Sequence, residues 1–449
     1  MLSFVCLAML LGIGYWLRRK LISLQRLYLP ASVIGGLIGL TLLQSFKAAG
    51  APLPAEWTLG WSKLPGDLIN VTFACLFLGV EIPGISKVWK SSGRQLAYGQ
   101  IVAWGQYVVG CGLVMALLGP LFNLHPVFGG ILPVGFEGGH GTAGGLGPVF
   151  DQLGWSEGKD FALASATGGI ICAITIGMTL VNWAVRKGHV SQKRPPTEEA
   201  AEENWSGIIP KDDRPRAGHL TVSNAVIESL SLHLVLVAAA ILIGYGFKNI
   251  LVLLEGTMPA VAKHHLLSSF PLFPLCMLGG LVVQLLADRF DPDDLIDHGL
   301  MRRIQNTALD YLVVAAIATI RLDVVLQGWL PLVILIIAGT LWNVFCVTWL
   351  ARRVFKTAWF ERAIAEMGQS MGVAATGLLL LRVVDPDHET PAAEAFACKQ
   401  LLHEPFMGGG LWTGMAIPLL AAVGLAPVFG IACAAVLIWA VLLAVTHKA

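Results

Sequence analysis

The sequence predicts an all-α polytopic membrane protein with two inverted-topology repeats. Three observations predict this fold class. First, 55% of the 449 residues are hydrophobic and only 13% are charged, roughly half the charged fraction of a soluble protein. Second, the apolar runs are long and continuous, which favours spanning helices over the alternating pattern of barrel strands. Third, the same order of spans occurs on both sides of a central polar segment.

Each half contains five apolar runs that predict transmembrane helices. In the first half they cover residues 2–17, 28–46, 66–83, 96–118 and 161–185. In the second half they cover residues 222–247, 267–287, 305–326, 328–350 and 405–423. One additional span at 425–446 has no counterpart.

An apolar but glycine-broken segment lies between the fourth and fifth spans of each half, at residues 127–150 and 363–384. Glycine and proline weaken or break a helix. At membrane depth, irregular backbone is tolerated only where it is buried in protein or lines a watery cavity. Both segments are therefore predicted to be re-entrant hairpins.

These elements divide the chain into four parts. Residues 1–186 form the first repeat, 187–220 a cytoplasmic linker, 221–424 the second repeat and 425–449 an extra C-terminal helix. Because each repeat has an odd number of spans, the second enters the membrane in the opposite orientation, as in many secondary transporters. The third span of each half supports this pairing of the repeats. The distance along the sequence from Asn70 to Glu81 equals the distance from Asp310 to Arg321.

The distribution of basic residues predicts the orientation. With the N-terminus outside, most of the 30 Lys and Arg residues, Lys399 among them, fall on the cytoplasmic side. The outer side receives Lys47, Lys63, Lys159, Lys248, Lys263 and Arg321. Counting either hairpin as a full span would invert the later loops and remove this bias.

Several classes of protein are excluded by composition and by missing motifs. The net charge of +1 argues against a nucleic-acid partner, and the 8 cysteines contain no Cys-x-x-Cys pair, so they are interpreted as buried apolar residues. No nucleophile elbow, zinc-protease motif or phosphate-binding loop occurs. The chain is therefore expected not to be an enzyme, and an ion gradient is expected to supply the energy.

Substrate binding is predicted at the tips of the two hairpins, which should meet near the membrane midplane. Glycine allows close backbone approach, and the free amides at a helix start favour an anion. The alternative is that these glycines only permit close helix packing. The predicted substrate-binding residues are Gly138, Gly139, His140, Gly141, Thr142, Gly368, Gln369, Ser370, Gly372 and Thr376.

The predicted coupling ion is a hard, oxygen-liking cation such as sodium. The candidate ligands are Asn70, Thr72, Glu137, Asp310 and Glu366. Each also has a structural interpretation. Thr72 can bond to its own helix backbone, Asp310 can lie at a solvated helix start, and the two glutamates can face water. His140 can bind substrate, carry a proton or brace the tip.

The run Gly-Gly-His-Gly-Thr at residues 138–142, followed by Ala143 and Gly144, resembles the bacterial sodium/glutamate symporter family. Residues 72–79 and 160–169 look similar too, although the second hairpin has fewer glycines than the family's second loop. The resemblance implies a homodimer in the bacterial inner membrane that takes up glutamate with sodium, with a transport unit moving against a scaffold. The alternative is sodium- or proton-coupled transport of another organic anion, such as a di- or tricarboxylate.

Overall fold

The computed structural model describes residues 1–448 except for residues 28, 52, 81–84, 192–207, 210, 259–261, 263–265, 387 and 388. Glu81 and half of the predicted linker 187–220 therefore lie outside the described residues. Within the described ranges all regular structure is helical, and nine helices are long and apolar enough to cross a membrane. This confirms the predicted class of an all-helical, polytopic membrane protein.

The helices before the central segment are α1 (Leu2–Lys20), α2 (Ile22–Arg26), α3 (Ala31–Ala48), α4 (Ala55–Thr58), α5 (Leu64–Ala74), α6 (Ile85–Leu113), α7 (Gly119–Phe122), α8 (Ile131–Phe136), α9 (Gly139–Gly145), α10 (Gly147–Gln152) and α11 (Glu157–Arg186). After it come α13 (Ser229–Thr257), α15 (Leu272–Phe290), α16 (His298–Ala318), α17 (Leu322–Gln327), α18 (Trp329–Phe345), α19 (Ala351–Val354), α20 (Trp359–Val384), α21 (Ala392–His403), α22 (Leu411–Val423) and α23 (Leu425–Lys448).

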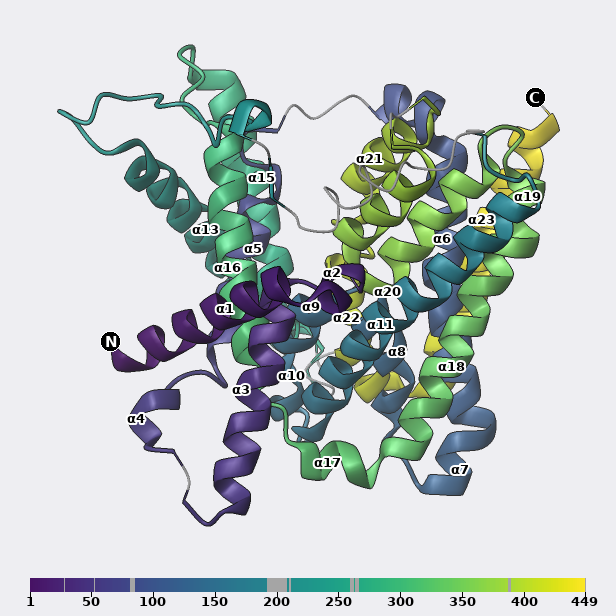
Figure 1. The fold of residues 1–449 in the computed structure, drawn as a ribbon, viewed down its shortest axis with the longest axis horizontal. Coiled ribbons are helices and arrows are strands. Elements are labelled where there is room, and N and C mark those ends of the chain that lie inside the picture. The colour runs from purple at the N-terminus through teal and green to yellow at the C-terminus, as the bar shows by residue number, and fades with distance from the viewer. Residues whose placement is uncertain are drawn as a thin grey trace.

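The helices form two bundles that lie side by side (Figure 1). We call α1, α3, α5, α13, α15 and α16 the first bundle, and α6, α8, α11, α18, α20, α21, α22 and α23 the second bundle. Each bundle therefore combines helices from both halves of the chain. The short helices α9 and α10 lie between the two bundles, where α9 contacts α5 and α16 on one side and α11 on the other.

Two close helix crossings in the first bundle have the same construction. α1 crosses α3 where a Cβ atom on Gly35 would lie 2.6 Å from the carbonyl oxygen of Leu10. α13 crosses α15 where a Cβ atom on Gly279 would lie 2.0 Å from the carbonyl oxygen of Ala240. Glycine is required at both positions because each backbone contacts the other directly, the usual form of close helix packing in membranes.

The next glycine of α3 and the next glycine of α15 also make matching contacts. A Cβ atom on Gly36 of α3 would lie 3.3 Å from the carbonyl oxygen of Val314 in α16. A Cβ atom on Gly280 of α15 would lie 2.2 Å from the carbonyl oxygen of Ala74 in α5. The second and third spans of opposite halves therefore pack against each other in the same way.

Residues 126–152 enter the second bundle and turn back. In the first arm, Phe128 stacks edge-on against Phe161 and Gly135 faces Ser165, so this arm runs parallel to α11.

In the second arm, His140 contacts Thr167 while the later Gly147 faces Lys159, so this arm runs antiparallel to α11. The chain between the two arms reverses direction at the start of α9.

Residues 359–384 also reverse direction, because α20 consists of two helical arms that meet at a kink. The backbone leaves helical geometry at Gly372 and at Val373, where φ is +71°. A Cβ atom on Gly368 would lie 2.7 Å from the Cα atom of Gly377, so the two arms pack directly against each other.

Several spans differ from their predicted bounds, and the eighth, expected at 305–326, is divided into α16 and α17. The third span, expected at 66–83, is helical only to Ala74, with a 3₁₀ turn Cys75–Phe77 after it. The last span of the second half, expected at 405–423, follows a second helix, α21, that the sequence interpretation left in a loop. Residues 404–410 interrupt the helix between α21 and α22. The final helix, α23, packs along α6.

Candidate functional site

The tips of the two chain reversals meet at the middle of α11. At the first tip, Gly139 has a φ of +65°, and a Cβ atom there would lie 2.6 Å from Cγ1 of Val373 at the second tip. Beneath them, a Cβ atom on Gly169 of α11 would lie 2.4 Å from the carbonyl oxygen of Met371. Glycine is needed at Gly139 both for its positive φ and for this close approach.

The polar side chains of the first tip are buried. Nε2 of His140 lies 2.9 Å from Oγ1 of Thr167, whose hydroxyl donates to the carbonyl oxygen of Leu163. The hydroxyl proton is therefore already used, and His140 donates to Thr167, which braces the tip against α11. Thr142 faces the interruption between α21 and α22, where a Cβ atom on Gly409 would lie 2.1 Å from its Oγ1 atom.

The polar side chains of the second tip hold the turn together. Ser370 donates to Oδ1 of Asn343 at 2.5 Å, and its carbonyl oxygen accepts from Nε2 of Gln106 at 2.7 Å. Thr376 donates to the carbonyl oxygen of Gly372 across the reversal, at 2.5 Å.

Glu137, at the end of the first arm, begins a buried polar network. Its side chain is 2% exposed. Oε1 of Glu137 accepts from Nε2 of Gln369 at 2.8 Å and from Nε2 of His403 at 2.5 Å. The network therefore joins both hairpins to α21, three segments that are far apart in the sequence.

Lys399 and Glu366 form the second part of this network, and neither has exposed surface. Nζ of Lys399 donates to Oε1 of Glu366 at 2.5 Å, to Oε1 of Gln369 at 3.1 Å and to Oε1 of Gln400 at 2.8 Å. The other carboxylate oxygen of Glu366 accepts from Nε2 of Gln95 at 2.9 Å. All three ammonium protons and both carboxylate oxygens thus have partners, as a buried ion pair requires.

Sequence reasoning missed Lys399 and His403. It placed both outside the membrane because residues 392–403 are too short and too polar for a span. No apolar stripe in the sequence marked them, because the inward face of α21 includes both polar residues. The buried residues of α21 recur at helical spacing and give the helix one inward face; they are Ala392, Ala395, Phe396, Lys399 and His403.

The five predicted sodium ligands do not form one group. Asn70 and Thr72 donate to the carbonyl oxygens of Gly66 and Leu68 on their own helix, at 2.9 and 3.0 Å. Asp310 is exposed on α16. Glu137 and Glu366 belong to the buried network instead. Within the described part of the chain, no three His, Cys, Asp or Glu side chains gather closely enough to hold a metal ion.

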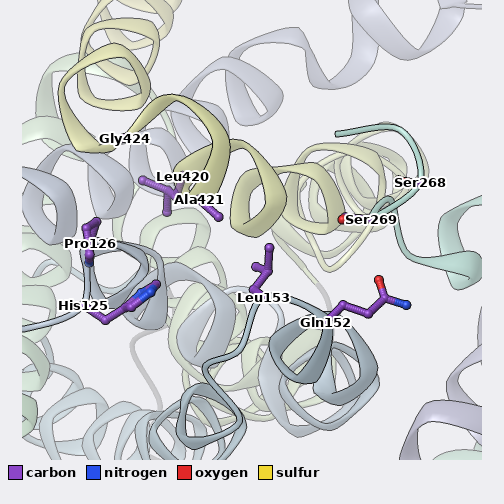
Figure 2. Close-up of a pocket in the computed structure, with 9 residues that line it drawn as sticks. All are labelled: His125, Pro126, Gln152, Leu153, Ser268, Ser269, Leu420, Ala421 and Gly424. Atoms are coloured by element: carbon purple, nitrogen blue, oxygen red, sulfur yellow. The ribbon is translucent and has the colours of Figure 1, made fainter. Parts of the chain in front are cut away.

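A pocket of about 640 Å³ lies where the first hairpin begins and ends. Figure 2 shows that it opens between the end of α22, the two ends of the hairpin and the segment before α15. No residue of the buried network lines the pocket, and the lining residues include a histidine but no Asp, Glu, Lys or Arg. Its lining residues are His125, Pro126, Gln152, Leu153, Ser268, Ser269, Leu420, Ala421 and Gly424.

His125 is neutral at pH 7 in this pocket. Burial lowers the pKa of His125, and the opposing effect of Glu157 does not reverse the shift. The pocket therefore offers neutral hydrogen-bonding groups and no fixed charge to a solute.

Comparison with known proteins gives the following similarities. The sequence model of the family described as sodium/glutamate symporter matches residues 1–358, which includes the first hairpin and ends just before α20. A sodium/glutamate symporter of Haemophilus influenzae is 26% identical over 173 residues, or 38% of this chain. The alignment spans only 40% of that relative's length. No solved structure matches the chain.

Proposed function

Because this chain belongs to the sodium/glutamate symporter family, we propose that it carries glutamate across a membrane together with sodium. The family is one of transporters, in agreement with the expectation that the chain is not an enzyme. The observation that carries the proposal is the meeting of two chain reversals, at Gly139 and Val373, inside the membrane-spanning part of the molecule.

The proposed substrate site is the junction of the two tips with the interruption at residues 404–410. The backbone amides at the start of α9 and after Val373 are proposed to receive the substrate carboxylates, because the amides at a helix start are not used within the helix. Thr142 adds a hydroxyl beside Gly409. The predicted residues Gly138, Gly139, Gly141, Gly368 and Gly372 contribute by letting backbones approach.

Sodium is proposed to bind oxygen atoms on α5 and α16, the helices that contact α9. Asn70 Oδ1 and the Asp310 carboxylate are the leading candidates, with the hydroxyl oxygen of Thr72 as a further ligand, since its lone pairs stay available while its proton is donated to Leu68. Glu137 and Glu366 are less suited, because Oε1 of Glu137 and both oxygens of Glu366 accept N–H or ammonium donors. A sodium ion needs acceptors that are free.

The paired glycine contacts of Gly35 with Leu10 and of Gly279 with Ala240 support an inverted repeat within residues 1–186 and 221–424. In the proposed cycle the first bundle is a scaffold and the second bundle moves against it, carrying both tips. The chain is proposed to act as a homodimer in the bacterial inner membrane, with the N-terminus outside.

Uptake of labelled glutamate into proteoliposomes, with and without an inward sodium gradient, tests this function. We expect uptake with the gradient and little without it. Gly139→Val should lower uptake at least tenfold, since the new side chain would collide with Val373, while Gly12→Val, where a Cβ atom meets nothing within 4 Å, should retain it. Equal uptake with and without sodium would contradict the coupling.

A second candidate is the transport of another organic anion by the same fold. It is favoured by one observation, that the family match ends at residue 358 and so excludes the second hairpin and α21. Competition of labelled glutamate with unlabelled aspartate, 2-oxoglutarate, succinate and citrate separates the two candidates. Stronger competition by a di- or tricarboxylate than by glutamate would favour the second.

A further inference from the structure

The buried network leaves one carboxylate oxygen without a partner. Oε1 of Glu137 accepts two hydrogen bonds, but Oε2 has no partner among the described residues and no accessible surface. Leaving a buried, ionised oxygen unpaired is costly, so such an atom is expected to acquire a partner during function.

The protonation of His403 follows from its neighbours. The indole N–H of Trp104 donates to Oε1 of Gln100 at 3.1 Å, which turns the Gln100 amide nitrogen toward Nδ1 of His403, at 3.3 Å. Because an amide nitrogen only donates, Nδ1 of His403 must accept. The ring proton is therefore on Nε2, where it donates to Glu137, and His403 is neutral.

The charges around Glu137 do not balance. The ionisable groups of the network around it are Tyr107 on α6, Glu366 on α20, which pairs with Lys399 and acts on His403, and Lys399, His403 and Glu404 on α21 and just after it. Among these groups only Lys399 carries a positive charge, and its ammonium is fully used by Glu366, Gln369 and Gln400. The group therefore has an excess of negative charge centred on Glu137.

A proton meets this need better than a metal ion does. A sodium ion would require several free oxygen ligands and space around Oε2. The neighbours of Glu137 at Oε1 are N–H groups of Gln369 and His403, and Oε2 is enclosed. A proton binds to a single oxygen, occupies almost no volume and removes the buried charge.

We propose that Glu137 is a proton-binding site, and that one proton binds to its Oε2 atom together with each anionic substrate. This inference rests on the proposed function. A substrate carboxylate at residues 139–142 would lie about one helical turn from Glu137, and like charges favour protonation of the carboxylate. Proton and substrate binding are then reciprocally coupled. An O–H bond forms at Oε2 of Glu137 as an O–H bond of a solvent hydronium ion breaks, and His403 keeps its proton on Nε2.

Binding of labelled glutamate to the purified protein, at constant sodium and varied pH, tests the inference. At pH values where Glu137 is ionised in the free protein and protonated in the complex, the affinity should rise about tenfold for each unit by which pH falls, as coupling to one proton requires. Glu137→Gln, which imitates the protonated state, should bind with an affinity that does not depend on pH. Glu394→Gln, an exposed carboxylate on α21, is the matched control and should behave like the wild type.

Three outcomes would overturn the inference. They are a wild-type affinity that does not vary with pH, a pH dependence that persists in Glu137→Gln, and a loss of sodium dependence alone in that variant, which would make Glu137 a sodium ligand. Should Glu137→Gln not fold, Glu137→Asp decides, because its displaced carboxylate must shift the midpoint of the pH dependence. An unchanged midpoint contradicts the proposal.

A failure of the proposed function gives a different result. If glutamate does not bind to the wild type at any pH, the proton site is tested without substrate by infrared difference spectra between low and high pH. A protonated-carboxyl band that is lost in Glu137→Gln supports the site. Identical spectra for the two proteins overturn it.

Discussion

The burial of Lys399 depends on the residues that surround its side chain. Its ammonium and the carboxylate of Glu366 have no exposed surface. Gly99 of α6 provides the room, since a Cβ atom there would lie 2.5 Å from Oε1 of Glu366 and 2.6 Å from Cε of Lys399. The pair therefore occupies a notch that glycine leaves open, and the second hairpin and α21 are tied to α6 through it.

Removing one charge of this pair should destabilise the folded protein more than removing both charges. Lys399→Met leaves Glu366 buried without its cation, and we expect it to lower the free energy of unfolding by about 3–5 kcal/mol. The double variant Lys399→Met with Glu366→Met should lose much less. Unfolding by sodium dodecyl sulfate in mixed micelles measures both.

The exposed Lys356→Met is the matched control and should be close to neutral. A double variant that is as unstable as Lys399→Met would show that the two charges do not act as a pair.

At the scale of the helix, corresponding elements in the two halves use the same contacts. Gly35 and Gly279 touch the carbonyl oxygens of Leu10 and Ala240. Helix α11 is continuous, whereas its expected counterpart is divided into α21 and α22. The interruption brings Gly409 beside Thr142 and allows His403 to reach Glu137. The divergence of this element therefore creates contacts that an uninterrupted helix would not make.

Alanine substitutions at the paired glycines test this correspondence. Gly35→Ala and Gly279→Ala should both lower the melting temperature of the purified protein, because the added methyl group meets backbone atoms at 2.6 and 2.0 Å. Gly12→Ala and Gly246→Ala lie on α1 and α13, where a Cβ atom meets nothing within 4 Å, and should be neutral or stabilising. Equal effects at all four positions would mean that these crossings do not depend on glycine.

At the scale of the whole molecule, each bundle draws on both halves of the chain (Figure 1). Helices α9 and α10 lie where the bundles meet, with Gly144 against Pro65 of α5 and His140 against Thr167 of α11. A movement of one bundle against the other would therefore displace the first tip relative to α5 and α16. This arrangement suits alternating access around the tips.

Labelling of single cysteines tests the proposed orientation. In a background without the 8 native cysteines, Ser62→Cys before α5 should react with a membrane-impermeant maleimide in intact cells. Asn224→Cys, before α13, should react only after the cells are opened. Both positions are exposed. The reverse pattern would place the N-terminus in the cytoplasm, and labelling of both in intact cells would contradict the assigned number of spans between them.

The sequence by itself determined the membrane class, the two chain reversals and the family. Long apolar runs, glycine clusters and the Gly-Gly-His-Gly-Thr run at residues 138–142 are local signals. They can be recognised without knowing which distant segments pack against them. Only the tertiary structure decided which polar side chains meet. Glu137, Glu366 and Gln369 could be selected as buried candidates, but their partners Lys399 and His403 lie on a short helix with no hydropathy signal. Burial and pairing of charges depend on contacts between distant segments, and these contacts, not local composition, give Glu137 its unpaired oxygen.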